Sequence, residues 1–310
     1  MCSVAGRKAL GRIVHSTSRC IYENLAYEEH LLRTHDPEKE GELMMMWSNR
    51  PAVVFGRHQN PWAEVALDEA ARRHVAVARR HSGGGTVYHD EGNLNISLLT
   101  SQKAHCRKRN LEMIARAING RFAVKVVPTS RDDLEMQPGS RKCSGTAARI
   151  VRGRAYHHMT MLVDVDLARL SGILRSDLQT RVLSTATRSV RAPAVGYLRQ
   201  DDARDASVDA LASCLANAWR EGFEKVDETH VDVGDATRTV DGVRKAIDEL
   251  KDWEWIYGRT PAFEFETRGG ELIKIRNGRV AEVSYCHCRL RGNLKSKRWV
   301  QNWESIFNPK

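Results

Sequence analysis

The sequence predicts an α+β fold, with a mixed sheet in a large first domain and a smaller α+β unit at the C-terminal end. Short runs with strand-like alternation stand between stretches with helical spacing of apolar residues, and a polar stretch interrupts this pattern after residue 226. The chain has 310 residues, of which 41% are hydrophobic, so it can bury a substantial core. No run of about 20 consecutive apolar residues occurs, and we expect no membrane-spanning helix.

The first domain is expected to extend over 21–226. Asn60 caps a predicted helix that has Pro61 at its first position and Glu64 in its first turn, and that ends near residue 74. Apolar spacing predicts further helices at 24–33, 110–122 and 207–226. Alternation and β-branched content predict strands at 43–47 and 52–56, joined as a hairpin, and at 75–80, 93–100, 124–127, 132–136, 145–151 and 157–165.

The second unit is predicted from a change of composition. Residues 227–240 are polar and short of bulky apolar side chains, which indicates a linker. Residues 241–310 then form the expected accessory domain, with strands at 263–267, 271–278 and 281–286. The tail after about 285 is basic and irregular, and no structure is predicted for it.

The first 20 residues have the composition of a mitochondrial transit peptide, with four basic residues, several hydroxyl residues and no acidic residue. On a helix, Val4, Leu10, Ile13 and Val14 would form a rough apolar stripe beside the basic side chains. Such a signal directs a protein to the mitochondrial matrix. The alternative is a basic, frayed terminus.

The cysteines and the net charge narrow the class of protein. Seven cysteines at irregular spacing argue for a reducing compartment. Cys286-His287-Cys288 is the one stretch that locally resembles a metal site, and it lacks a second pair at matching spacing, so no metal is expected. The net charge of +10 comes from 49 basic and 39 acidic residues spread along the chain, which favours an acidic partner.

The stretch ARRHSGGGTVYHDEGNLNIS at 78–97 places three glycines between two predicted strands. Consecutive glycines leave backbone N–H groups unscreened and allow positive φ, which suits close approach of a phosphate or a bulky ligand. The loop is neither a Walker A loop nor a dinucleotide fingerprint, because no Gly-Lys-Ser/Thr follows and the chain leads into a strand. A simple turn would not need the surrounding polar side chains, which are Arg79, Arg80, Ser82, Tyr88, His89, Asp90 and Asn93.

The residues RRHSGGGTVYHDEGNLN resemble the signature of the lipoate-protein ligase and lipoyltransferase family, which has the biotin/lipoate ligase catalytic fold. Three further stretches resemble this family in the same order: GRHQNPWAE at 56–64, RKCSGTAARIVRGRAYHHMTMLVDVD at 141–166 and KDWEWIYGRTPAFEF at 251–265. The last is similar to the accessory domain of mitochondrial lipoyltransferases. The resemblance covers about 21–265, and the tail after about 285 lies outside it.

The resemblance implies a site for lipoyl-AMP. In it the glycine loop wraps the lipoyl chain and the phosphate, Arg131 lies near the adenylate, and Lys142 is the catalytic residue that reaches the acyl carbonyl and phosphate. An ammonium group there would stabilise the charge that develops on the carbonyl oxygen and the leaving AMP. The expected binding residues are Arg79, Ser82, Gly83, Gly84, Gly85, Tyr88, His89, Asp90, Asn93, Arg131, Ser144, Gly145, Thr160, Val190, Arg191 and Ala192.

Two other chemistries are possible near Lys142. Cys143 could carry the acyl group, as a cysteine does in related octanoyltransferases, although adjacent residues on a strand point to opposite faces. For the same reason at most one of His157 and His158 can enter the site, and a zinc pair there would lack a third ligand.

The resemblance implies an acyltransferase that places lipoyl groups on lysines of the lipoyl domains of 2-oxoacid dehydrogenase E2 subunits. The donor would be lipoyl-AMP or the lipoylated glycine-cleavage H protein, and the alternative is ATP-dependent ligation of free lipoate with Mg. The WEWIYGRTP stretch at 253–261 favours transfer. Octanoyl transfer also stays open, since a pocket for an eight-carbon chain need not distinguish acyl groups strongly. No tightly bound cofactor is expected.

A basic nucleic-acid-binding protein is the alternative from a different class, suggested by KAHCRKR at 103–109. The sequence has no recognisable helix-turn-helix, RNP sequence or zinc module, and aromatic residues make up only 6% of it. Biotin ligation is disfavoured because SGGGTVYHD stands where biotin ligases resemble GRGRxGRxW. We therefore expect neither nucleic acid nor a membrane as partner.

Overall fold

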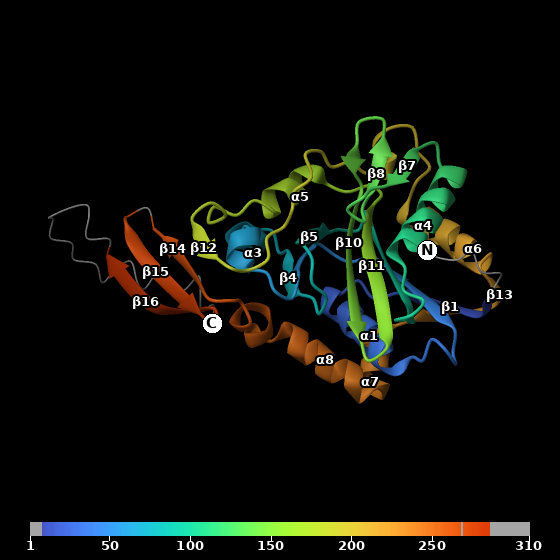
Figure 1. The fold of residues 1–310 in the computed structure, drawn as a ribbon, viewed down its shortest axis with the longest axis horizontal. Coiled ribbons are helices and arrows are strands. Elements are labelled where there is room, and N and C mark those ends of the chain that lie inside the picture. Colours follow the sequence, from blue (N-terminus) through green and yellow to red (C-terminus); the bar gives the residue numbers. More distant parts are fainter. Residues whose placement is uncertain (1–7, 268, 286–310) are drawn as a thin grey trace.

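The computed structural model describes residues 8–267 and 269–285 (Figure 1). Mixed sheets carry helices on their faces, which confirms the predicted α+β fold. The largest sheet has six strands in the order β10-β11-β6-β2-β1-β13. In chain order these strands are β1 (Lys8–Ser16), β2 (Glu42–Trp47), β6 (Asn93–Ser101), β10 (Ser144–Val151), β11 (Arg154–Leu162) and β13 (Phe223–Val231).

Two three-stranded sheets complete the first domain, in the orders β4-β3-β5 and β7-β8-β9. Their strands are β3 (Ala52–Phe55), β4 (Ala76–Arg79), β5 (Val87–His89), β7 (Lys125–Pro128), β8 (Leu134–Gln137) and β9 (Arg141–Lys142). The predicted hairpin of 43–47 with 52–56 is wrong, because β2 pairs with β1 and β6 whereas β3 pairs with β4 and β5. Every residue of β2 and β3 is buried, so each strand is central in its own sheet.

Both faces of the six-stranded sheet are covered by helices. Met44 and Met46 of β2 pack with α4 (Arg107–Arg121) and α6 (Val208–Arg220). Met45 and Trp47 point to the other face, where Leu32 of α1 (Ile21–Thr34) joins their cluster. This alternation follows from the two-residue period of a strand. No helix within the described residues is long and apolar enough to span a membrane.

The predicted transit-peptide helix is wrong for the described part of that segment. β1 lies between β2 and β13 in the sheet, and Ile13 and Val14 are buried on its two faces. Two adjacent apolar residues fit a strand that is buried on both faces, and they also fit the apolar stripe of a short helix. The local pattern therefore could not distinguish a strand from a helix here. Residues 1–7 lie outside the described residues.

The predicted linker at 227–240 is also wrong. β13 covers 223–231 and pairs in parallel with β1, and α7 (Val233–Thr239) follows it, so the helix expected at 207–226 ends at Arg220. Among the described strands β13 pairs with β1 alone, and most of its side chains are partly or fully exposed. An edge strand of this kind needs few apolar residues, which explains its polar composition.

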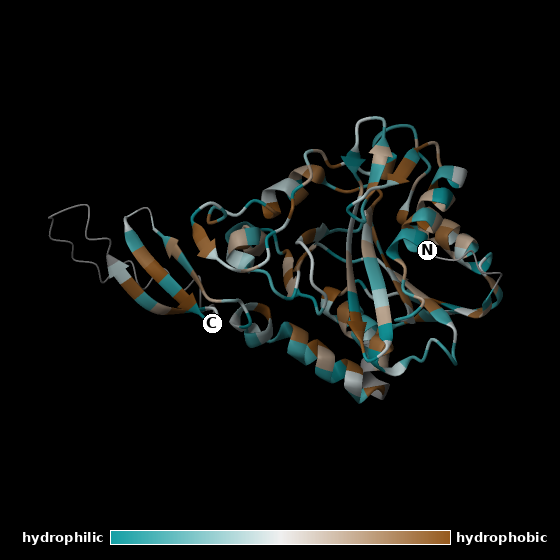
Figure 2. Cartoon of the chain, in the orientation of Figure 1, coloured by the Kyte–Doolittle hydropathy of each residue, from teal (hydrophilic) through white to brown (hydrophobic). Residues whose placement is uncertain are grey.

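The helix α8 (Asp241–Lys251) packs on the first domain instead of joining an accessory domain. Its buried residues Val243, Ile247 and Leu250 lie on one face and contact the cluster formed by α1 and the β4-β3-β5 sheet. Figure 2 shows hydrophobic and hydrophilic residues mixed along this helix, as expected for one buried and one exposed face. A π-helical turn, Glu254–Gly258, follows it.

The separate C-terminal unit is a four-stranded antiparallel sheet at one end of the molecule (Figure 1). It contains β12 (Val182–Ser184), β14 (Phe263–Glu266), β15 (Glu271–Arg276) and β16 (Arg279–Tyr285), which confirms the three strands expected after 260. Phe263 and Phe265 pack with Trp62 of α2 (Pro61–Glu64), which attaches this sheet to the first domain.

Candidate active site

A cavity of about 1460 Å³ lies beside the glycine loop and is lined in part by residues of β10 and β11. Its other walls come from the β7-β8-β9 sheet, the helix α5 (Leu167–Ile173) and the segment 187–195. The volume exceeds the roughly 300–1,000 Å³ of most small-molecule pockets. The expected site residues that line the cavity are Gly84, Gly85, Tyr88, Arg131, Lys142, Ser144, Gly145, Thr160, Val190, Arg191 and Ala192.

The lining changes character from one supporting element to another. Leu167 and Leu170 of α5, with Leu174 just after it, supply an apolar part. Arg131 and Lys142 supply cationic side chains from the β7-β8-β9 region. The cavity can therefore hold a molecule that combines an apolar chain with an anionic group.

The glycine loop is held from inside by Arg80, which was not among the expected binding residues. Arg80 is 4% exposed, and its Nη2 donates hydrogen bonds to the main-chain oxygens of Gly83 at 2.5 Å and Gly85 at 2.7 Å. Burial lowers the pKa of Arg80 to about 10, so the guanidinium remains charged at neutral pH. Because Arg80 donates hydrogen bonds to main-chain oxygens of the loop, a side chain outside the cavity lining fixes the loop's conformation.

The N–H groups of Gly84 and Gly85 have no hydrogen-bond partner within the described part of the chain. Gly84 has φ +86°, and an added Cβ would lie 2.9 Å from Arg80 Nη2. A side chain at Gly84 would therefore strain the backbone and displace the guanidinium. Both glycines line the cavity, so their free N–H groups are available to an anionic ligand.

Ser82, His158 and Glu28 have the hydrogen-bond order of a hydrolytic triad. His158 Nε2 lies 2.9 Å from Ser82 Oγ, and His158 Nδ1 lies 2.9 Å from Glu28 Oε1. Arg80 Nε also donates to Ser82 Oγ at 2.9 Å, and Ser82 is 2% exposed and outside the cavity lining. A nucleophile must reach its substrate, so this set supports the glycine loop from behind.

Arg79 departs most clearly from the expected binding set. It is fully buried outside the cavity lining, and its Nε lies 2.9 Å from the main-chain oxygens of both Trp255 and Ile256. Its Nη2 donates to Thr260 Oγ1 at 2.8 Å, while Trp255 Nε1 donates to the Arg79 oxygen at 2.7 Å. Arg79 thus fastens the π-helical turn to β4. Adjacent arginines leave a strand in opposite directions, and their order along the chain could not tell which one faced the loop.

His89, Asp90, Asn93 and Gly83 also lie outside the cavity lining. Burial, followed by the nearby Arg80 charge, lowers the pKa of His89 to about 3, so this histidine is neutral and contacts the Asn49 amide at 3.0 Å. The two carboxylate oxygens of Asp90 accept hydrogen bonds from N–H groups of Gly92 and Asp166. His89, Asp90 and Asn93 belong to the turn between β5 and β6, whereas Gly83 belongs to the glycine loop, where its main-chain oxygen accepts from Arg80.

Lys142 lies in the cavity lining on the short strand β9. Its main chain is fixed on both sides, because Glu135 of β8 pairs with it and its N–H donates to the Ala194 oxygen at 3.0 Å. Its Nζ donates to Asp133 Oδ2 at 2.7 Å, with the two side chains 25% and 15% exposed. The ammonium group is thus anchored by one carboxylate at the edge of the ligand space.

Cys143 points away from Lys142 into the hydrophobic core, as the strand period predicts. Its Sγ donates to the Leu134 oxygen at 3.4 Å, and burial raises the pKa of the thiol to about 12. A thiol with this pKa is protonated at neutral pH. Cys143 also lies outside the cavity lining. These properties argue against Cys143 as an acyl carrier.

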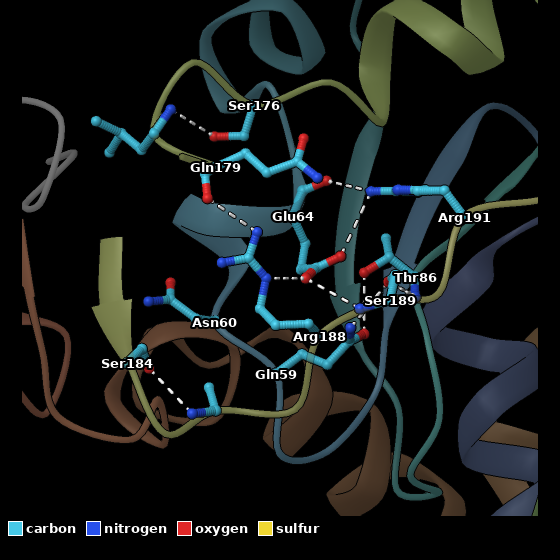
Figure 3. A network of polar contacts seen from close by, with 12 residues as sticks. Gln59, Asn60, Glu64, Thr86, Ser176, Gln179, Ser184, Arg188, Ser189 and Arg191 are labelled. Atoms are coloured by element: carbon cyan, nitrogen blue, oxygen red, sulfur yellow. Dashed lines mark hydrogen bonds and ion pairs between the residues drawn. The ribbon is translucent and has the colours of Figure 1, made fainter. Parts of the chain in front are cut away.

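Glu64, at the end of α2, holds the wall formed by the segment 187–195 (Figure 3). Its Oε1 lies 3.0 Å from Arg188 Nε, and its Oε2 lies 3.4 Å from Arg191 Nη2. The Glu64 side chain is 2% exposed, whereas those of Arg188 and Arg191 are 36% and 34% exposed. One buried carboxylate therefore fixes two partly exposed arginines of this segment.

Ser189 joins that segment to the glycine loop. Its Oγ accepts hydrogen bonds from Thr86 N at 2.8 Å and Gln59 Nε2 at 3.0 Å, as Figure 3 shows. Gln59 Oε1 in turn accepts from the Gly56 N–H at 2.8 Å and from Thr86 Oγ1 at 2.9 Å. The two walls are connected through this short set of polar contacts.

Glu64, Gln59 and Ser189 were missed as site residues. Gln59 and Glu64 stand in GRHQNPWAE, which supported the family resemblance, so the motif was a signal that residue-by-residue reasoning did not use. Ser189 directly precedes the expected residues 190–192, but its contacts with Thr86 and Gln59 come from distant parts of the chain, which no local pattern identifies.

Sequence comparison identifies similar proteins over most of the chain. Residues 20–220 match the family model described as the lipoyl protein ligase A/B catalytic domain. The mitochondrial lipoyl amidotransferase LIPT1 of Homo sapiens is 37% identical over 286 residues, which cover 87% of this chain and 74% of that protein. The same-named protein of Mus musculus is 39% identical, covering 83% and 68%. Lipoate-protein ligase A of Psychrobacter cryohalolentis is 30% identical, covering 83% and 76%.

Solved structures show the same fold. Plasmodium falciparum LipL1 in complex with lipoate aligns with a TM-score of 0.69 at 21% identity, covering 89% of this chain and 84% of that one. A lipoate-protein ligase A bound with ATP aligns with a TM-score of 0.60 at 22% identity, covering 80% and 98%. At these identities the likeness supports the fold alone.

Proposed function

Because the chain belongs to the lipoyl protein ligase A/B family, as its sequence motifs predicted, we propose that it is an acyltransferase that attaches lipoyl groups to lysines of lipoyl domains. Relatives with 37% and 39% identity are named lipoyl amidotransferases, which favours lipoyl transfer over ligation of free lipoate. Within the site, the observation that carries this proposal is that Lys142 lines the same cavity as Gly84 and Gly85, whose N–H groups have no partner among the described residues.

We propose lipoyl-AMP as the substrate of this cavity. The apolar side chains of Leu167, Leu170 and Leu174 suit the lipoyl chain. The free N–H groups of Gly84 and Gly85 suit a phosphate. The side chain of Arg131 has no acidic partner within ion-pair distance among the described residues, so it is available for the same anion. Arg79, Ser82, Gly83, His89, Asp90 and Asn93 are proposed as supports of this site.

The proposed transfer forms a C–N bond between the acceptor lysine and the acyl carbon, and breaks the C–O bond to AMP. AMP leaves with the bonding electrons, and the attacking amine releases a proton. Negative charge grows on the acyl oxygen and on the phosphate as these bonds change. Lys142 is proposed to stabilise that charge, with Asp133 orienting its ammonium group in advance.

We propose that the acceptors are lipoyl domains of 2-oxoacid dehydrogenase E2 subunits in the mitochondrial matrix. The names of the amidotransferase relatives include the mitochondrion, which supports this compartment. The net charge of +10 would accelerate encounter with an acidic domain, at a rate that falls as salt rises. Lipoylated H protein is the second proposed donor.

ATP-dependent ligation of free lipoate is the second candidate function. A relative with 30% identity is named lipoate-protein ligase A, and a ligase of the same fold was solved with ATP bound. The two functions differ in the donor: a ligase makes its own lipoyl-AMP from lipoate and ATP with Mg, whereas a transferase receives a lipoyl group that is already activated or attached to H protein.

The deciding experiment gives the purified protein a lipoyl domain and one of three donors: lipoyl-AMP, lipoate with ATP and Mg, or lipoylated H protein. Intact mass spectrometry then measures lipoyl addition to the acceptor lysine. We expect addition from lipoyl-AMP or H protein and little from lipoate with ATP. Equal addition from lipoate with ATP would establish the ligase function, and no addition from any donor would remove the assignment.

In the same assay, Lys142→Ala should lower the transfer rate by about 10² to 10³, because it removes the proposed charge stabilisation. Its free energy of unfolding should change by less than about 1 kcal/mol, since the lost ion pair is partly exposed. Lys125→Ala is the control and should keep the parent rate, because Lys125 is exposed on β7 and lies outside the cavity lining. An unchanged rate in Lys142→Ala would contradict its role.

A further inference from the structure

Away from the cavity, one group of side chains has the geometry of a metal site. His15, Glu228 and His230 each offer a ligand atom, and these atoms all lie within 4.8 Å of one another. Among the described residues no second group of histidine, cysteine or carboxylate side chains meets this condition. None of the three lines the proposed acyl-transfer cavity.

Strand pairing brings the three residues together. β1 and β13 run parallel, and His15 and His230 are partners in register (strand positions in Figure 1). Glu228 precedes His230 by two residues, so its side chain leaves β13 on the same face. The two imidazole rings stack with centroids 4.6 Å apart and planes inclined by 12°. Ligands on paired strands are held by rigid backbone, which favours a defined site.

Contacts with His15 and with the Arg220 guanidinium orient the Glu228 carboxylate. His15 Nε2 lies 2.7 Å from Glu228 Oε1, and Arg220, at the end of α6, contacts Glu228 Oε2. One carboxylate oxygen thus faces the imidazole ligands while the guanidinium holds the other. Metal-binding carboxylates commonly have an outer partner of this kind.

The site is accessible and close to the dimensions that zinc requires. The side chains of His15 and Glu228 are 19% and 30% exposed, and His230 is exposed at the edge of the sheet. Three nitrogen and oxygen ligands at about 2.0–2.2 Å from Zn²⁺ lie roughly 3.4 Å from one another. Modest side-chain rotations would bring the observed spacings to that value.

We propose that His15, Glu228 and His230 form a binding site for Zn²⁺, with water as the fourth ligand. Two imidazoles and one carboxylate suit zinc, whereas Mg²⁺ and Ca²⁺ prefer sites made of oxygen ligands. The ion would tie the carboxyl ends of β1 and β13. From that point α7 and α8 lead to the π-helical turn that Arg79 fastens, so zinc would stabilise the attachment of this C-terminal part.

The test uses the full chain without a histidine tag. Calorimetric titration should detect one bound Zn²⁺ per chain, and zinc should raise the melting temperature in a manner that a chelator reverses. His15→Asn and His230→Asn should each weaken zinc affinity by at least about tenfold and abolish the stabilisation. His74→Asn is the matched control, because His74 is exposed elsewhere and has a positive φ that asparagine tolerates.

A Cys286→Ser/Cys288→Ser variant separates this site from the Cys286-His287-Cys288 stretch, which lies outside the described residues. It should retain the zinc-dependent stabilisation. Loss of binding in the cysteine variant, together with full binding in both histidine variants, would overturn the proposal, as would absence of zinc binding by the parent. If a histidine variant fails to fold, Glu228→Gln replaces it, since a neutral amide is a poor zinc ligand with the same shape.

Discussion

The glycine loop and the segment 187–195 are adjoining walls of one cavity, but opposite kinds of contact hold them. The guanidinium that holds the glycine loop belongs to a residue that is 4% exposed, and it donates to neutral main-chain oxygens. The arginines of the segment 187–195, which are 36% and 34% exposed, are held by ion pairs to the buried Glu64 carboxylate, and hydrogen bonds of Ser189 and Ala194 add to them. Water and salt weaken exposed ion pairs far more than buried hydrogen bonds. We infer that the loop is a fixed cradle and that the segment is the wall able to open.

The largest expected effect comes from Arg80→Met, which breaks the fixed wall. It leaves the oxygens of Gly83 and Gly85 without their donor. The free energy of unfolding should fall by about 3 kcal/mol, because hydrogen bonds to buried charged groups contribute about 1.5–3 kcal/mol each. Denaturant unfolding measures this loss. Arg72→Met, which removes an exposed pair with Glu69, is the control, and a similar small loss in both variants would contradict a special role for Arg80.

Acid should lower the free energy of unfolding through two histidines in and beside the glycine loop. Burial is the main cause that lowers the pKa values of His81 and His89 to about 3, whereas both titrate near 6.5 in the unfolded chain. Below about pH 6.5 the unfolded state binds protons that the folded state does not, so the stability present at higher pH is lost as pH falls.

The loss should reach at most about 1.4 kcal/mol per pH unit for each histidine. Urea unfolding at several pH values between about 7.5 and 5 measures it. His89→Asn should make the pH dependence shallower. An identical slope in this variant would show that His89 is not held neutral.

Glu64→Gln tests whether the second wall opens. The amide keeps the shape of the side chain but removes the charge that pairs with Arg188 and Arg191. Stability should fall by about 1 kcal/mol, and trypsin should cut after these arginines several-fold faster because the segment detaches more often. Limited proteolysis with mass analysis measures the cuts. Glu69→Gln removes a comparable exposed pair on α3 (Leu67–Arg72) and should leave cleavage at these sites unchanged.

Ser189→Ala should have the smallest effect, because it removes only the connection between the two walls. Thr86 N and Gln59 Nε2 lose their acceptor, at a cost of about 0.5 kcal/mol, because both contacts are only partly buried. We expect a higher KM for lipoyl-AMP with a smaller change in kcat. Ser184→Ala is the control, because the Ser184 hydroxyl accepts a hydrogen bond from Ala186 N within its own turn and has no other hydrogen-bond partner among residues 8–267 and 269–285. Equal kinetics in both variants would exclude a connecting role for Ser189.

Local sequence patterns predicted several structural features of the candidate site. Three glycines predicted a loop between strands, and two of them line the cavity. The alternation of neighbouring residues in extended backbone predicted that Lys142 and Cys143 point in opposite directions. Asn60 also caps its helix as expected, since its side chain accepts a hydrogen bond from Trp62 N, but the helix expected to end near residue 74 is divided into α2 (Pro61–Glu64) and α3 (Leu67–Arg72). Each of these features depends on a few neighbouring residues, so the chain order contains the necessary information.

Contacts between distant segments were needed for the rest. Arg79 and Arg80 are adjacent and chemically alike, and the packing of the π-helical turn sends one to the C-terminal region while the other holds the loop. In the same way, β1 and β13 become neighbours only when the sheet assembles, which brings His15 to His230. Strand pairing and burial depend on residues far apart in the chain, and no local pattern specifies which partner each side chain meets.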